Sequence, residues 1–115
     1  DHMQELERKA YIFSVETIGL AMSMDKAGKQ KEVAARMKQA AGKVYTLLTD
    51  ALAAEENKDF ADLFRASYQQ AQDARDHLKA LNLAEQTLTE QREKLLTMAH
   101  EIIERMEEIL GKIIY

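Results

Sequence analysis

Residues 6–24 read LERKAYIFSVETIGLAMSM and place apolar or small side chains at alternating steps of four and three. An α-helix completes a turn every 3.6 residues, so side chains with this spacing share one face of a helix. The stretch therefore predicts an amphipathic helix whose buried seam consists of Leu6, Ala10, Phe13, Thr17, Leu20 and Met24.

The same rhythm recurs three more times along the chain. The second seam is Val33, Met37, Ala40, Val44, Leu47 and Ala51. The third is Phe60, Phe64, Ser67, Ala71, Ala74, Leu78 and Leu81. The fourth is Leu95, Ala99, Ile102, Met106, Ile109 and Ile113. Four seams of similar length predict four helices, each of about 22 to 26 residues.

The breaks between the seams are short and carry turn residues. They fall at 25–29, which contains Gly28, at 55–59 and at 82–89. Asn57 is a candidate N-cap for the third helix, and Thr87 or Thr89 for the fourth. Short connections force neighbouring helices to run antiparallel. We therefore expect an all-α protein, an antiparallel up-down-up-down four-helix bundle, with one domain over 4–115 and an expression-tag remnant at 1–3.

Composition agrees with a soluble helical domain. The chain of 115 residues has no proline and four glycines, and it is 46% hydrophobic and 31% charged. It contains no cysteine, which excludes thiolate zinc sites, iron–sulfur clusters and cysteine nucleophiles and fits a reducing compartment. No apolar run approaches the roughly 18 residues of a membrane span. We expect a cytoplasmic protein.

Residue patterns for catalysis are missing. A di-metal bundle needs Glu-x-x-His, but Ala74 and Thr97 stand three residues before His77 and His100. The four glycines are isolated and form no phosphate-binding loop. We expect no catalytic residue, no metal site and no cofactor.

One ligand-binding alternative remains open. His100 follows the seam residue Ala99, so it is a candidate axial ligand for haem held in the core, in a chain rich in methionine. The other interpretation is that methionine fills irregular gaps in the core. The alternative function is thus a bundle that carries haem or another apolar molecule.

Charge is concentrated more than its total suggests. The net charge is −4, yet residues 26–43 hold six basic side chains and one acidic one, Glu32. The predicted fold brings this segment to one end of the bundle, beside Arg75, His77 and Lys79, and gathers carboxylates at the other end. The basic end is either a contact for phosphate or an acidic protein, or an ordinary solvated helix end. The candidate partner-binding residues are Lys29, Lys31, Arg36, Lys38 and Lys43.

Two helices show a second apolar stripe beside the seam. Such stripes reflect either deeper burial within one bundle or a subunit interface. Because the first and fourth helices are neighbours in an up-down bundle, we expect their stripes to merge into one patch for homo-oligomer formation. The candidate interface residues are Tyr11, Val15, Ile18, Met22, Leu96, Ile103, Leu110 and Ile114.

Three short motifs resemble one known family. They are Lys9-Ala10-Tyr11-x-Phe13-Ser14-Val15, Arg36-Met37-Lys38-Gln39-Ala40-Ala41 and Lys58-Asp59-Phe60. With their mutual spacing, they resemble the four-helix-bundle proteins first noticed in intervening sequences of bacterial large-subunit ribosomal RNA genes. The accessory variability proteins of diversity-generating retroelements are related to that family. The resemblance covers residues 10–115.

The resemblance implies a function in assembly. The retroelement relatives are basic ring-forming oligomers that assist a reverse transcriptase and bind nucleic acid. The present chain departs from the family over residues 42–51, which lack the usual Ser-Ile, Asn and Glu-Gly markers, and its net charge of −4 weakens the case for nucleic acid. We expect a non-enzymatic, homo-oligomeric accessory or scaffold protein that docks a protein partner, such as a reverse transcriptase, or nucleic acid.

Overall fold

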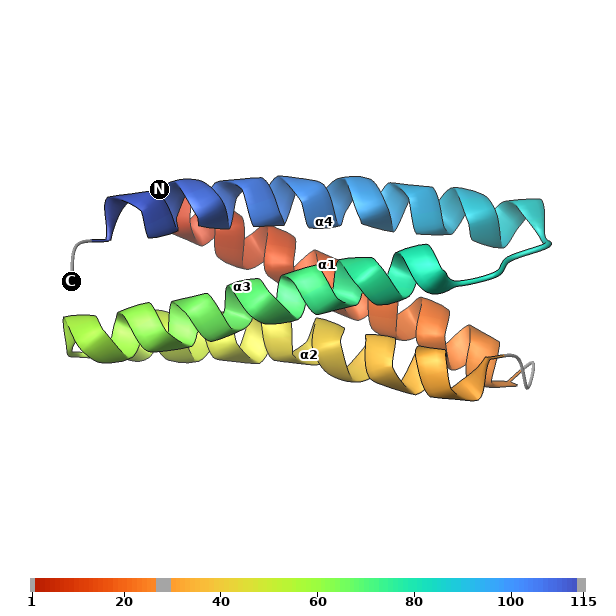
Figure 1. Ribbon diagram of the computed structural model, residues 1–115, viewed down its shortest axis with the longest axis horizontal. Helices are drawn as coiled ribbons and strands as arrows, with labels where there is room; N and C mark the ends of the chain where they lie inside the picture. Colours follow the sequence, from red (N-terminus) through yellow and green to blue (C-terminus); the bar gives the residue numbers. More distant parts are fainter. Residues whose placement is uncertain (1, 27–29, 114–115) are drawn as a thin grey trace.

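The computed structural model describes residues 2–26 and 30–113 and consists of four long helices (Figure 1). They are α1 (His2–Lys26), α2 (Lys31–Ala53), α3 (Asn57–Ala80) and α4 (Gln86–Lys112). The molecule measures 45 × 20 × 19 Å. The predicted all-α four-helix bundle is confirmed, and none of the described helices is long and apolar enough to cross a membrane.

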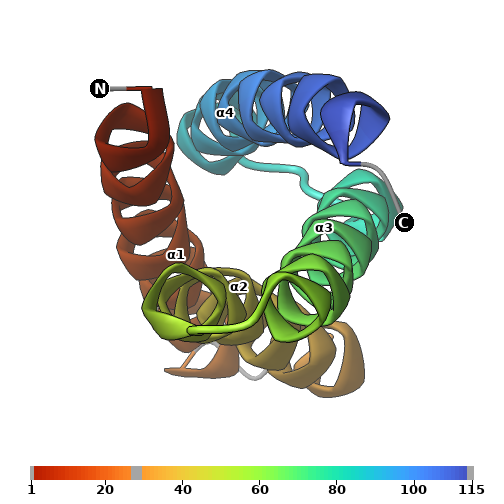
Figure 2. The same ribbon diagram turned by 90° about the vertical axis from the view of Figure 1, so that its left-hand side faces the viewer.

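The helices alternate in direction along the long axis of the molecule (Figure 1). Each contacts its neighbours in the chain, and α1 and α4 contact each other to complete the bundle (Figure 2). The α2–α3 contact is the most extensive and the α1–α4 contact the least. The order up-down-up-down follows from the short connections.

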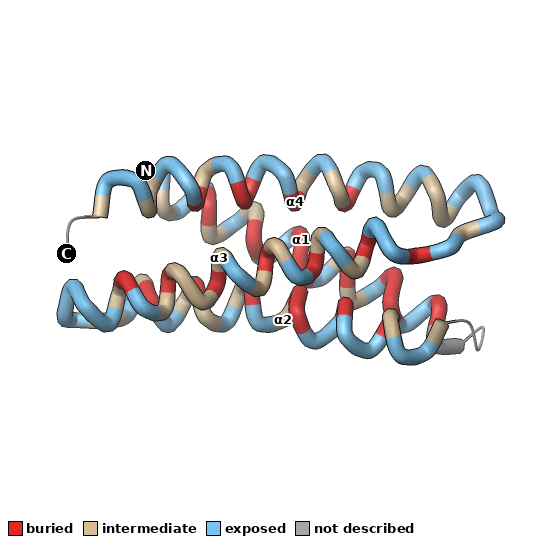
Figure 3. Tube along the Cα trace, in the orientation of Figure 1, coloured by how far each residue is buried: buried red, intermediate tan, exposed pale blue. Residues whose placement is uncertain are grey.

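The core lies where the four predicted seams meet (Figure 3). All six residues of the first seam are buried, from Leu6 to Met24, including the polar Thr17. Seam positions at the helix ends or edges are only partly buried: Val33, Leu47, Phe60, Ile109 and Ile113. The spacing of apolar residues thus predicted the buried face of every helix.

The predicted N-caps are wrong. The residue at the N-cap position is Glu56 for α3 and Glu85 for α4, both with extended backbone and no capping hydrogen bond from the side chain. Asn57 is already the first residue of α3. In α4 the hydroxyl of Thr89 donates to the carbonyl of Glu85 at 3.0 Å, one turn back. A threonine inside a helix commonly makes this bond, so Thr87 and Thr89 lie within α4. Gly28, expected in the first turn, lies outside the described residues.

Candidate interaction surface

The apolar stripe of α1 is largely uncovered in the single chain. Tyr11, Val15 and Met22 are each about half exposed, at 52%, 51% and 50%, and Ile18 is partly buried. The stripe borders α2: the Tyr11 ring meets the Tyr45 ring edge-on, with centroids 5.1 Å apart. An apolar stripe left uncovered on a soluble domain often marks an interaction site.

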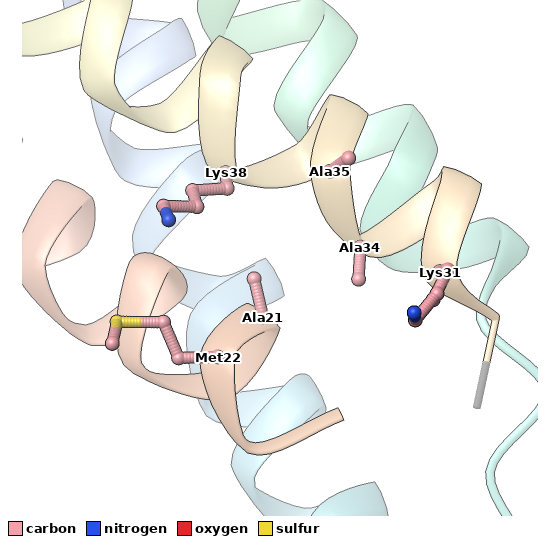
Figure 4. A pocket seen from close by; sticks show the side chains of 6 residues that line it. All are labelled: Ala21, Met22, Lys31, Ala34, Ala35 and Lys38. Atoms are coloured by element: carbon pink, nitrogen blue, oxygen red, sulfur yellow. The ribbon is translucent and has the colours of Figure 1, made fainter. Parts of the chain in front are cut away.

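Between the stripe and α2 the surface is hollowed at two places. The smaller hollow, of about 130 Å³, is lined by Ala21 and Met22 of α1 and by α2 residues that include Lys31 and Lys38 (Figure 4). The larger and more open hollow, of about 490 Å³, is lined by Ile18 of α1 and by α2 residues that include Lys38 and Lys43. We call the surface formed by Ile18, Met22, Lys31, Ala35, Lys38 and Gly42 the lysine-rimmed face.

Small residues of α2 form the floor of this face. Ala35 and Gly42 are seven residues apart and therefore lie on the same side of α2. A Cβ atom at Gly42 would stand 3.9 Å from Cδ1 of Ile18, so the glycine leaves room at the point where the two helices approach. Sequence reasoning missed these floor residues, although their heptad spacing beside the lysines was a usable signal.

Four of the five candidate basic residues are exposed on α2: Lys31, Arg36, Lys38 and Lys43. None of these four has an ion-pair partner among the residues that the structure describes. Lys29 lies outside those residues. Lys31 and Lys38, seven residues apart, line the smaller hollow together with Met22 (Figure 4), whereas Arg36 lines neither hollow.

The basic charge forms a local patch on α2 and does not extend over the whole end of the bundle. The same end contains the second half of α3 and the first half of α4, with exposed carboxylates at Asp73, Asp76, Glu90 and Glu93. Arg75, one of the residues expected to add positive charge there, is paired with the adjacent Asp76 at 3.1 Å. Lys79 of α3 and Lys94 of α4 are also exposed at this end, so the basic residues of α2 lie beside a surface of mixed charge.

The two apolar stripes do not merge. Ile103 of α4 is only 5% exposed, and Leu96 and Leu110 are partly buried against the core, while Ile114 lies outside the described residues. The α1 stripe lies toward α2, whereas α1 meets α4 on another side, through ion pairs such as Lys94–Glu16 at 3.5 Å. The expected joint patch is wrong because the α4 stripe contributes to the core of its own chain.

His100 does not lie in the core of the bundle. This residue is exposed on α4 and does not reach the core, which is the position that the haem-carrying alternative requires. The buried polar residues of the described chain are Ser14, Thr17 and Ser67, and they include no histidine. Among the described residues no group of three or more His, Asp or Glu side chains has the geometry to hold a metal ion.

A third hollow lies at the opposite end of the molecule, where α2 ends and α3 begins (Figure 1). It has a volume of about 480 Å³ and is lined by Asp50, Ala53, Ala54, Asp59, Asp62 and Leu63, which we call the acidic hollow. Lys58 donates to Asp62 at 3.0 Å, and this hydrogen bond raises the pKa of Lys58 above its usual value. The sequence predicted that these carboxylates lie at one end of the bundle, but it did not predict that the surface there is concave.

One solved structure shares this fold over nearly the whole chain. It is a protein of unknown function from the S23 ribosomal protein family of Bacteroides thetaiotaomicron, with a TM-score of 0.85 and 15% identity. The alignment covers 97% of this chain and all of the other. No family model and no curated protein matches the sequence. At this identity the likeness establishes the four-helix fold.

Proposed function

We propose that the protein is a non-enzymatic scaffold that self-associates through the α1 stripe and docks a protein partner through the basic residues of α2. The observation that carries the proposal is the stripe of Tyr11, Val15 and Met22, half exposed beside lysines with no ion-pair partner in the described structure. Apolar residues in this arrangement favour contact with another macromolecule.

A protein is the better partner for the basic patch than nucleic acid. Each phosphate contact needs a cation, and this chain carries a net charge of −4. The basic residues are few and confined to α2, next to an apolar surface that a phosphate backbone cannot use. The resemblance to proteins that assist a reverse transcriptase suggests the class of partner, and we place the complex in the cytoplasm.

Sedimentation velocity tests the self-association. We expect the wild-type chain to form oligomers at about 10 to 100 μM, which corresponds to an association free energy of roughly 5.5 to 6.8 kcal/mol, and Val15→Glu/Met22→Glu to remain monomeric with unchanged helix content. Gln69→Glu/Gln86→Glu, which adds the same charge at exposed positions outside the stripe, should associate like the wild type. A wild-type chain that is strictly monomeric over this range rejects this half of the proposal.

Co-purification with the product of the adjacent gene tests the docking. We expect Arg36→Glu/Lys43→Glu, and the triple variant that adds Lys38→Glu, to lose that product while wild type and Gln69→Glu/Gln86→Glu retain it. Fluorescence anisotropy with a labelled single-stranded RNA is the second measurement. Tight RNA binding that falls steeply with salt and is lost in Arg36→Glu/Lys43→Glu would reassign the patch to nucleic acid.

A further inference from the structure

The lysine rim restricts how two copies can meet on the α1 stripe. If two copies paired with their α1 helices antiparallel about a two-fold axis through the hollow beside Met22, Lys31 and Lys38 of one copy would lie close to the same lysines of the other. Like charges held that close inside a contact are destabilising. Symmetric antiparallel pairing centred on this hollow is therefore unfavourable.

The parallel two-fold arrangement does not satisfy the lysines either. It would place them over the opposite edge of α1, the edge that faces α4. The carboxylates there are already engaged, since Glu5 pairs with Lys9 at 3.7 Å and Glu16 pairs with Lys94 at 3.5 Å. The lysine-rimmed face thus needs carboxylates from a different surface.

The same chain carries such a surface in the acidic hollow. Its apolar floor of Ala53, Ala54 and Leu63 is bordered by Asp50, Asp59 and Asp62. Asp50 and Asp59 have no ion-pair partner among the residues that the structure describes, in contrast to Asp62. The lysine-rimmed face and the acidic hollow each combine apolar side chains with charged borders, and the charges of the two borders are opposite in sign.

We infer that self-association is heterologous: the lysine-rimmed face of one copy seats on the acidic hollow of a second copy. This inference rests on the proposed function, because it specifies which surface covers the α1 stripe. The two surfaces lie on different parts of the bundle, one between α1 and α2 and the other at the α2–α3 connection (Figure 1). After a single contact, the pair therefore retains one free surface of each kind, the acidic hollow on one copy and the lysine-rimmed face on the other.

The side chains on each surface suit this arrangement. Met22 is half exposed on the face, and a methionine side chain adapts to the irregular surface of a partner. A stable interface buries about 1,200 Å² or more in total, which exceeds what Met22 and the partly buried Ile18 provide. The charged borders must then lie within the contact, so the association should weaken as salt screens them. Arg36, which lines neither hollow, remains available to another partner.

Charge reversal followed by mixing tests the inference by sedimentation velocity. We expect Lys31→Glu/Lys38→Glu and Asp50→Lys/Asp59→Lys each to associate at least tenfold more weakly than wild type. Mixed one to one, the two variants should associate again, because each supplies the charges that the other has lost. The matched control Lys79→Glu/Lys112→Glu reverses two exposed lysines outside both surfaces and should associate like wild type. Circular dichroism confirms that every variant is folded.

The possible results separate the inference from the proposal on which it rests. If Asp50→Lys/Asp59→Lys associates as strongly as wild type, or if mixing restores nothing, the heterologous contact is overturned while self-association stands. If the wild type is itself monomeric, both fail. Loss of association in Asp50→Lys/Asp59→Lys alone, followed by recovery on mixing, supports the inference. In a symmetric contact through the stripe, that variant keeps its lysine-rimmed face and associates like wild type.

Discussion

The side-chain amide of Gln30 pairs with the backbone of Asn82 across 52 residues of sequence. Its Nε2 donates to the Asn82 carbonyl at 2.8 Å, and its Oε1 accepts from the Asn82 amide at 3.0 Å. Gln30 precedes α2 in the left-handed backbone region, at φ 50°, where a glycine is more comfortable. The two bonds tie the start of α2 to the α3–α4 connection and hold a residue in a costly conformation.

Replacing Gln30 should separate the hydrogen bonds from the backbone cost. Gln30→Ala loses both bonds and keeps the unfavourable φ, so we expect the free energy of unfolding to fall by about 1 to 2 kcal/mol. Gln30→Gly loses the same bonds but relieves a left-handed conformation worth about 1 kcal/mol, and should lie close to wild type. Urea denaturation measures both. Equal losses in the two variants would show that the backbone at this position is not strained.

Ser67 makes the closest polar contact between α2 and α3. Its hydroxyl is fully buried and donates to the carbonyl of Val44 at 2.7 Å. Ser67→Ala should cost about 1 kcal/mol, the usual net value of one hydrogen bond. Ser67→Val places two methyl groups against the α2 backbone, where overpacking costs typically about 1 to 3 kcal/mol. In thermal denaturation we expect stability to decrease from wild type to Ser67→Ala to Ser67→Val. A Ser67→Ala variant that is less stable than Ser67→Val would refute the close approach of the two helices.

Thr17 lies at the centre of the first seam and is not exposed at all. Its hydroxyl oxygen has no hydrogen-bond partner within residues 2–26 and 30–113. Thr17→Val keeps the shape and removes a buried, unsatisfied polar group, whose cost is about 1 to 3 kcal/mol. We therefore expect the valine variant to be more stable than wild type by about 1 kcal/mol or more in urea denaturation. Thr17→Ser, which keeps the hydroxyl and loses the methyl, should be less stable, and a destabilised valine variant would mean that the hydroxyl is satisfied.

The buried seams were predictable because burial along a helix is a local, periodic property of sequence. The rotation of each helix against its neighbours is not. Val15 and Ile103 belong to stripes with the same spacing in the sequence, yet Val15 is half exposed and Ile103 is 5% exposed. The difference arises because α1 and α4 present different sides to the helices beside them. The predicted N-cap of α4 was wrong because the hydroxyl of Thr89 donates to the carbonyl of Glu85 within the helix instead of capping it.

The interaction surface was predictable only in its parts. The sequence indicated the α1 stripe and the α2 lysines separately, as an oligomer interface and as a partner site. The structure joins them, with Met22 and Lys38 lining one hollow (Figure 4). Their juxtaposition depends on how α1 and α2 pack against each other. No pattern within a single helix contains that information.

Tyr68 should contribute a pH-dependent part of the stability. Its hydroxyl donates to Glu107 Oε2 at 2.7 Å, linking α3 to α4, and it also accepts from Gln72 at 3.1 Å. The hydrogen bond to Glu107, followed by partial burial, raises the pKa of Tyr68 above its ordinary value of 10.0. Because the folded-state pKa exceeds the unfolded one, the contribution is complete below about pH 10 and is lost as the pH rises through the folded-state pKa.

Tyr68→Phe removes this contribution at every pH. At pH 7 we expect the variant to be less stable than wild type by about 1 kcal/mol, the value of one hydrogen bond to a charged acceptor on a partly exposed surface. Urea denaturation between pH 7 and 11 should show the two curves converging above pH 10, where the wild-type phenol ionises beside the Glu107 carboxylate. Tyr11→Phe, a half-exposed tyrosine on α1, is the matched control and should show no such convergence. A constant difference across the whole range would mean that the phenol does not donate to Glu107 in solution.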